Sequence, residues 1–425
     1  MLSLLNPLDV ELQQSFTFVL FTPFVENYRA AKLEVVHQWK YLEWMQPSVH
    51  LTGNNFTLGN AFTQDVDVDK KGRVFVTSPK WPEGVPIVLS IVTDIEGPGG
   101  PLLTPYPDWT WHRAYDCNSF ITAYRIVIDE LNRLWVIDSG RIMDIAMCPA
   151  KLFVFDLNTD QLIHKYEIPV EQTLNGAASL VTPIVEIGDS PIDTFVYIAD
   201  VISYGMIVYD FRNDYSWRIN NTRGNAFGPD TEAANITIVG DTFNVSDGTL
   251  GMSLSPKGFY EHRYLYFNSL ASFYQKFSDT LSLKQSQYNK EPVVFQSKKR
   301  RQSQAGPQAT SRRGILFFQL VQDTALACWN IEKPFTPENI VYVGQDDVAL
   351  QYISGIKVIV NCYGEEEVWL NSNRLQKTIN SIRNPAELNY RVIKGRVDDL
   401  VRGTNCEPSG YHQPYPDTTS YWRRV

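Results

Sequence analysis

The stretch Arg133–Asp138, which reads RLWVID, carries the pattern that decides the fold. A short apolar run built around an aromatic residue and ended by a polar one is typical of a buried β-strand. The pattern recurs in five further stretches: Arg73–Ser78, Thr194–Asp200, Tyr264–Ser269, Gly314–Gln319 and Glu367–Ser372. The aromatic residues of the six stretches are Phe75, Trp135, Tyr197, Tyr266, Phe317 and Trp369, at separations of 60, 62, 69, 51 and 52 residues.

Strand-like segments flank these stretches. Several stretches follow a turn signal, such as Asp69–Gly72 or Ser255–Gly258, with another short strand before the turn. A further strand comes after, clearest in Leu152–Leu157 and Met206–Phe211. Repeated units of this kind are typical of four-stranded propeller blades. The sequence therefore predicts an all-β fold, a six-bladed β-propeller over residues 31–425 with the C-terminal tail included. A pair of β-sandwiches is the alternative, but it does not explain six matched strands.

The two ends of the chain complete the predicted organisation. Leu33–Trp44 is strand-like and has no blade of its own, so we expect it to pair near Leu388–Ile393 and close the ring, which hides two sheet edges. Residues 1–30 are expected to be a leader. Phe16–Val25 resembles the apolar core of a signal peptide, but Asp9 and Glu11 precede it without any Lys or Arg, so the leader is an atypical one.

Composition narrows the partners and the compartment. The net charge of −9 argues against a nucleic-acid partner, and no apolar run is long enough to span a membrane. The five cysteines form no CxxC pair, and the six histidines show no metal-ligand spacing, so neither a metal nor a cofactor is expected. Scattered cysteines together with sequons favour disulfides in a secreted glycoprotein, although five buried thiols in a cytosolic protein remain an alternative. The sequons are at Asn55, Asn220, Asn235 and Asn244.

Polar residues at the strand ends are the candidates for a binding site. Standard catalytic motifs are missing, and no catalytic residue is assigned. The mouth of a propeller's central channel is reached by strand ends from every blade, so polar residues there could bind a small molecule. The ligand-binding candidates are Asp138, Asp200, Asn268, Asn371 and Asn373. The alternative is that such residues cap turns by bonding backbone N–H groups.

Over nearly its whole length the chain resembles the insect yellow and major royal jelly proteins. The stretches that carry the resemblance are Lys32–Tyr41, Arg73–Pro86, Pro101–Trp111, Thr122–Gly140, Tyr197–Phe211, Gly314–Asn330 and Val368–Leu375. The resemblance implies a secreted six-bladed propeller with disulfides Cys117–Cys148 and Cys328–Cys406. Cys362 would remain a free thiol that behaves as a small apolar residue at a strand end.

The resemblance also implies the candidate functions. The first is a secreted protein of cuticle pigmentation and the melanin pathway that binds a catechol or indole amine at the channel mouth, near Asn373. An aromatic residue two positions after Asn373 would stack on the ring of such a ligand, but this position is Leu375, which argues against stacking there. The second is a dopachrome isomerase with Asp138 or Asp200 as base, and the third is a structural or storage secretion without a ligand.

The basic run at residues 298–301 is interpreted as a solvated loop leading into blade five.

Overall fold

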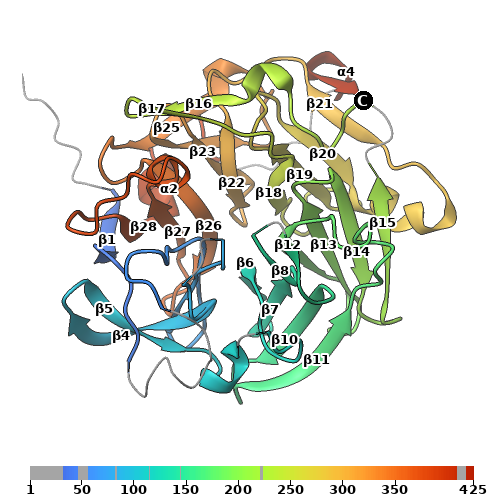
Figure 1. Ribbon diagram of the computed structural model, residues 1–425. Coiled ribbons are helices and arrows are strands. Elements are labelled where there is room, and N and C mark those ends of the chain that lie inside the picture. The colour runs from blue at the N-terminus through green and yellow to red at the C-terminus, as the bar shows by residue number, and fades with distance from the viewer. Residues whose placement is uncertain are drawn as a thin grey trace, which may run out of the picture. The chain divides into compact units, whose positions relative to one another are not determined.

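Six antiparallel β-sheets stand around a common axis, as the ring in Figure 1 shows. This computed structural model describes residues 32–45, 56–81, 84–113, 115–143, 145–220, 224–408 and 418–425. The leader predicted over residues 1–30 and the sequon at Asn55 lie outside the described residues. The six-bladed β-propeller predicted from the repeated strand pattern is confirmed.

Blades one to three each have four strands, numbered from the axis outward. Blade one contains β2 (Val66–Val68), β3 (Val74–Thr77), β4 (Leu89–Gly97) and β5 (Gly100–Pro105). Blade two contains β6 (Ala123–Ile128), β7 (Arg133–Asp138), β10 (Lys151–Asp156) and β11 (Gln161–Glu167). Blade three contains β12 (Leu180–Ile187), β13 (Thr194–Asp200), β14 (Gly205–Asp210) and β15 (Tyr215–Asn220).

Blades four and six take strands from the chain ends. Blade four contains β18 (Thr249–Leu254), β19 (Tyr264–Ser269), β20 (Lys276–Asp279), β21 (Val294–Ser297) and the C-terminal β29 (Trp422–Arg424). Blade five contains β22 (Ala305–Thr310), β23 (Ile315–Leu320), β24 (Ala325–Asn330) and β25 (Ile340–Gln345). Blade six contains β26 (Tyr352–Val360), β27 (Glu366–Asn373), β28 (Tyr390–Arg396) and the N-terminal β1 (Glu34–Trp39).

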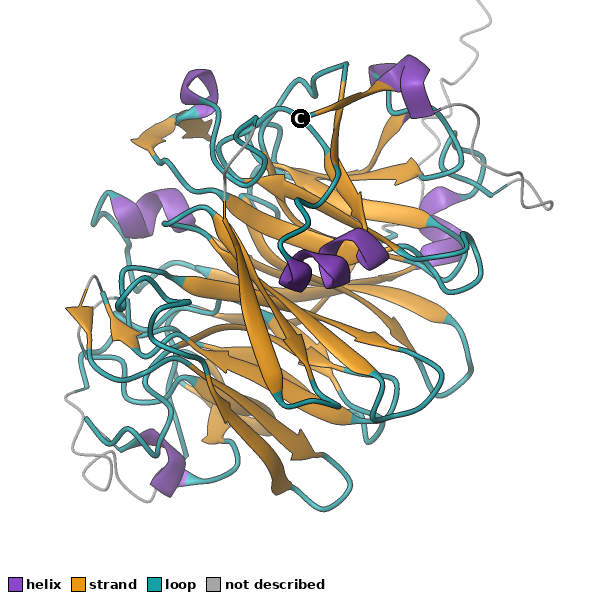
Figure 2. Cartoon of the chain, turned by 90° about the vertical axis from the view of Figure 1, so that its right-hand side faces the viewer, coloured by secondary structure: helices purple, strands orange, loops and turns teal. Residues whose placement is uncertain are grey.

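The remaining elements are short. Two ribbons consist of β8 (Arg141–Ile142) with β9 (Ile145–Ala146), and β16 (Asn235–Ile238) with β17 (Asp241–Asn244). The helices are α1 (Thr280–Gln285), α2 (Leu375–Ile379), α3 (Val397–Val401), α4 (Thr418–Tyr421) and the 3-10 turns η2 (Trp109–His112), η3 (Thr231–Ala233), η4 (Ser286–Tyr288) and η5 (Pro337–Asn339). Figure 2 shows these helices as brief purple segments beside long orange strands. Within the described ranges, no helix is long and apolar enough to cross a membrane.

Each aromatic stretch of the sequence pattern lies on the second strand of a blade. These strands are buried on both faces because each blade packs against the blades before and after it; in β7 and β23 every residue is buried. The outermost strands, such as β11, alternate between partly and fully exposed side chains. Double burial explains why the second strands read as continuous apolar runs, and why the fold could be counted from them.

The apolar core consists of layers between neighbouring blades. Phe75 of blade one packs with Leu134 and Phe153 of blade two, and Trp135 of blade two packs with Tyr209 of blade three. The inner strands β2, β6, β12, β18, β22 and β26 contact one another in ring order, and β26 contacts β2 to complete the circle.

The predicted ring closure is confirmed. Strand β1 pairs antiparallel with β28, with Glu34 opposite Lys394 and Trp39 opposite Tyr390. Trp39 is fully buried, and its indole Nε1 donates to the carbonyl oxygen of Pro101 in blade one at 2.7 Å. The N-terminal strand therefore fastens blade six to blade one.

The cysteines form two disulfides and one free thiol. The bonds join Cys117 to Cys148 and Cys328 to Cys406, the two pairs that the family resemblance implies. Cys362 is free, but the expectation of an apolar strand end is wrong: it is exposed, just beyond the end of β26.

The basic run before blade five is only partly a solvated loop. Arg301 is 1% exposed, and its guanidinium donates to the carbonyl oxygens of Ser272 and Tyr274 and to Oε1 of Gln275. Burial lowers its pKa to about 9. The expectation of a solvated run is therefore wrong for its last residue, because a string of like charges does not reveal which member turns inward.

Candidate functional site

The five predicted ligand residues come from the same end of the ring. The inner and second strands of a blade are antiparallel, so the start of one faces the end of the other. The register places Ala123 opposite Asp138, Leu180 opposite Asp200 and Tyr352 opposite Asn373. We call this the amide end, defined by Asn268, Asn371 and Asn373. The other end, where turns join inner and second strands, is the turn end.

Asp138 anchors the loop that leads into blade two. It is 0% exposed, and its Oδ2 accepts from the backbone N–H of Ile121 at 2.8 Å. Its Oδ1 accepts from the N–H groups of Thr122 at 2.8 Å and Gly140 at 2.9 Å. Burial raises the pKa of this carboxyl, and the three N–H groups act in the opposite direction. Asp138 therefore caps a turn by accepting hydrogen bonds from backbone N–H groups, which is the structural alternative to ligand binding.

Asp200 is also occupied by protein groups. Its Oδ2 accepts from Nη2 of Arg218 at 2.8 Å in a buried ion pair. Its Oδ1 accepts from the backbone N–H groups of Ser179 at 2.9 Å and Ser203 at 3.0 Å. A cationic ligand at either Asp138 or Asp200 would therefore have to displace existing partners.

The three asparagines use their amide nitrogens within the protein. Nδ2 of Asn268 in blade four donates to the carbonyl oxygen of Ala305 in blade five at 2.8 Å. Nδ2 of Asn373 in blade six donates to the carbonyl oxygen of Thr63, before blade one, at 2.8 Å. Nδ2 of Asn371 donates to Oγ of Ser354 within blade six at 2.7 Å. Asn268 therefore links blade four to blade five, and Asn373 links blade six to the segment before blade one.

The amide oxygens, by contrast, are buried without a donor among the described residues. A backbone carbonyl can only accept, so the nitrogens of Asn268 and Asn373 must face it and their oxygens must face the other way. Buried acceptors without partners cost about 1–3 kcal/mol each, which favours donors from water or a ligand. The atoms in this state include Oδ1 of Asn268, Asn371 and Asn373, Oε1 of Gln304, Gln319 and Gln376, and the hydroxyls of Thr63 and Ser78.

Asp247 is the charged residue that sequence reasoning missed. It precedes β18 by two residues, and its carboxylate makes no hydrogen bond or ion pair with any described residue. Burial raises its pKa to about 6, while the charge of Arg125 acts to lower it. The sequence placed this aspartate in a polar loop beside the sequon at Asn244, and only its proximity to an inner strand hinted otherwise.

Tyr352 is close enough to Asp247 and Arg125 for their charges to change its pKa. Burial raises the pKa of the Tyr352 phenol; Arg125 lowers it and Asp247 raises it. The Tyr352 hydroxyl makes no hydrogen bond within the described part of the chain, although the residue is 1% exposed. Asp247 and Tyr352 are therefore two polar groups at the amide end whose hydrogen-bonding capacity is unused.

The ribbon of β16 and β17 contacts α2, which follows β27 of blade six. Lys377 of α2 forms an ion pair with Asp241 at 3.2 Å, and Nδ2 of Asn380 donates to the carbonyl oxygen of Thr242 at 3.1 Å. The ribbon therefore connects the segment after blade three with α2 of blade six.

Three sequon asparagines are exposed. Asn220 ends β15, while Asn235 and Asn244 face each other on the ribbon, where Nδ2 of Asn244 donates to Oδ1 of Asn235 at 2.9 Å. Exposure is necessary for glycan attachment, which itself stays a prediction. Among the described residues, no group of three His, Cys, Asp or Glu side chains is arranged to hold a metal ion.

The chain is a β-propeller whose amide end holds buried amide oxygens without donors among the described residues. A model of the family described as Major royal jelly protein matches residues 121–406. Major royal jelly protein 9 of Apis mellifera is 35% identical over 400 residues, covering 90% of this chain and 92% of the relative. Protein yellow of Drosophila yakuba is 32% identical over 415 residues, covering 94% of this chain and 75% of the relative. The chain belongs to the yellow and major royal jelly protein family.

Solved structures are more distant. A virginiamycin B lyase from Staphylococcus aureus aligns with 80% of this chain and 97% of its own at 11% identity and a TM-score of 0.41. A likeness at this level carries no argument about function.

Proposed function

We propose that this chain is a secreted yellow-type protein of the pigmentation and melanin pathway that binds a protonated catechol or indole amine at the amide end. The observation that carries the proposal is Asp247, a largely enclosed carboxylate without a partner among the described residues, at the same end of the ring as buried amide oxygens that lack donors. An ammonium group would neutralise the carboxylate, and ring hydroxyl or indole N–H groups would donate to the amide oxygens.

The counter-charge is assigned to Asp247 rather than to the two aspartates expected from the sequence. Asp138 and Asp200 already accept hydrogen bonds from backbone N–H groups, and Asp200 also pairs with Arg218. The amine would therefore bind beside Tyr352, near Asn371 and Asn373. Secretion is supported by the two disulfides, since such bonds persist in oxidising compartments.

Calorimetric titration of the purified full chain with dopamine, serotonin, octopamine and tyramine tests the proposal. We expect Asp247→Asn to weaken binding at least about tenfold, because a charge-assisted hydrogen bond contributes about 1.5–3 kcal/mol. Asp189→Asn, at an exposed aspartate beyond β12, removes the same charge and should leave binding unchanged. Binding should also weaken as the pH falls below 6, where Asp247 takes up a proton. No affinity for any of the four amines would refute the proposal.

The isomerase alternative also points to Asp247. Removal of a ring proton needs a base with an accessible lone pair, and a carboxyl with a pKa of about 6 suits that role near neutral pH. Dopachrome absorbance followed with wild type and Asp247→Asn separates the two functions. If dopachrome decays at its spontaneous rate with both proteins, the chain binds amines without catalysing the reaction. If the wild type alone accelerates the decay, the chain is an isomerase that uses Asp247. Absence of both activities would favour the structural or storage alternative.

A further inference from the structure

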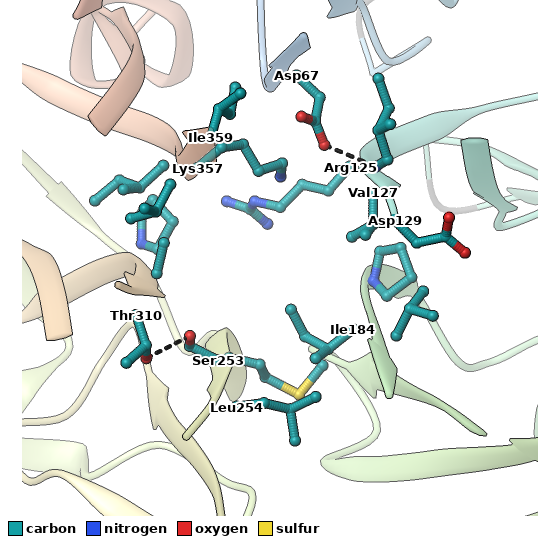
Figure 3. Close-up of a pocket in the computed structure, with 18 of the residues that line it drawn as sticks. Asp67, Arg125, Val127, Asp129, Ile184, Ser253, Leu254, Thr310, Lys357 and Ile359 are labelled. Carbon is teal, nitrogen blue, oxygen red and sulfur yellow. Dashed lines mark hydrogen bonds between the residues drawn. The ribbon is translucent and has the colours of Figure 1, made fainter. Parts of the chain in front are cut away.

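The turn end of the ring opens into a pocket of about 560 Å³, within the size range of small-molecule sites. Residues from the inner strands of all six blades line it, as Figure 3 shows in close-up. The five ligand candidates from the sequence lie at the amide end, so this pocket is separate from the site proposed for the amine.

Half of the residues that line the pocket are apolar. Side chains that belong to different blades surround the opening in Figure 3, among them Val127, Ile184, Leu254 and Ile359. Val127, Ile184 and Ile359 retain partial exposure, which places their apolar surface at the open space. Contact with water there is unfavourable, and an apolar ligand would remove it.

Arg125 reaches from β6 into the middle of this pocket (Figure 3) and is 2% exposed. Its Nε and Nη2 donate to the carbonyl oxygen of Ser354 at 3.1 and 2.8 Å, and its Nη1 donates to Oγ1 of Thr182 at 3.2 Å. A guanidinium has five N–H groups, so two remain. Within the described ranges no carboxylate forms an ion pair with Arg125, and burial lowers its pKa. A buried cation in this state is costly and favours an anionic partner.

The charged residues near Arg125 have other partners or act on it without direct contact. Nζ of Lys357 pairs with Oδ2 of Asp65 at 2.7 Å, so this pair is neutral overall. Asp67 accepts from the backbone N–H of Ile128 at 2.8 Å, and burial raises its pKa to about 7, so it carries only part of a charge at neutral pH. Asp65, and Asp247 from the amide end, also raise the pKa of Arg125 through space, without forming an ion pair with it.

We propose that the turn-end pocket binds a small organic monocarboxylate with an apolar body. The carboxylate accepts the two remaining N–H groups of Arg125, a geometry that suits the planar fork of a guanidinium. The apolar body packs against Val127, Ile184 and Ile359. A monoanion matches the one guanidinium at the middle of the pocket, whereas a phosphate dianion would bury excess charge.

Titration calorimetry with three probes tests the proposal on the purified full chain. Decanoate carries both features, decan-1-ol has the apolar body without the charge, and acetate has the charge without the body. We expect decanoate to bind, and each of the other probes to bind at least about tenfold more weakly. Equal affinity for decanoate and decan-1-ol, or no binding of decanoate, would overturn the proposal.

Two variants in the pocket and one control outside it locate the site. Ile184→Glu places a negative charge in the wall and should abolish decanoate binding, while Ile192→Glu makes the same change at a side chain that is 46% exposed outside the pocket and should leave binding intact. Arg125→Gln should weaken binding at least about tenfold. Thermal unfolding of each variant confirms that it is folded, and unchanged decanoate affinity in folded Ile184→Glu would refute the location. Amine titration of Ile184→Glu keeps this outcome distinct from the amide-end proposal, because that change leaves Arg125 and Asp247 in place.

Discussion

The carboxylate of Asp138 either holds the loop before blade two or binds a ligand, and the variant Asp138→Asn distinguishes these two roles. Asparagine has nearly the same shape, but only one of its two terminal atoms accepts hydrogen bonds. With its oxygen in the position of Oδ1, the bonds from Thr122 and Gly140 remain in neutral form. The amide nitrogen then faces the backbone N–H of Ile121, which now bonds Oδ2 at 2.8 Å.

The size of the effect follows from this geometry. One buried N–H loses its acceptor, which costs about 1–3 kcal/mol, and two charge-assisted bonds become weaker neutral ones. Relief of the buried charge offsets part of this loss, because burial already raises the pKa of Asp138. We therefore expect the free energy of unfolding to fall by about 2–3 kcal/mol.

Urea unfolding and amine titration of the same preparations are the assays. The variant should lose stability yet bind amines as the wild type does, once measured under conditions where it is folded. Asp189→Asn serves as the control and should change stability by less than about 0.5 kcal/mol. A variant of wild-type stability that no longer binds amines would refute the capping role and return Asp138 to the ligand site.

Three further predictions concern pH, ring closure and thiol chemistry. Burial lowers the pKa of His112 to about 3 from 6.5, so the unfolded chain takes up a proton that the folded protein does not as the pH falls below 6.5. The free energy of unfolding should therefore fall by about 2 kcal/mol between pH 8 and pH 5 because of His112. Urea unfolding of His112→Gln at the two pH values should lack this part of the decrease. Trp39→Ala should cost about 3–5 kcal/mol in the same assay, and a loss below about 1 kcal/mol would mean that β1 does not hold the ring closed. Cys362 should react with a thiol reagent in the folded protein, whereas a silent thiol would contradict its exposed position.

The blade count was predictable because burial on both faces leaves a mark in the sequence. Strands such as β7 and β23 must be apolar throughout, so their repetition reveals the ring. The closure by β1 was predictable for a related reason, since a strand without a blade must hide its edge. The outer strands carry weaker patterns because one face contacts water, and β29 gave no signal of its place in blade four.

The candidate site was predictable in position but not in role. Strand ends placed Asp200 and Asn268 at the amide end, yet a sequence does not show which polar atoms are already occupied. Asp247 illustrates the converse: this loop residue beside a sequon interacts with the charge of Arg125 in blade two, because it lies just before the inner strand of blade four. Hydrogen-bond partners come from other blades, so they are set by tertiary packing.

The repeated stretch around Trp135 and its five counterparts therefore determined, by itself, that the chain folds as a ring of six blades. Periodic burial is a local property that each strand must satisfy, and so it is written into the order of residues. Only the tertiary structure decided that Arg125 makes no ion-pair contact and that the carboxylate of Asp247 receives no hydrogen bond within the described residues. Charge pairing depends on distances between blades that are far apart in the chain, and no local pattern records those distances.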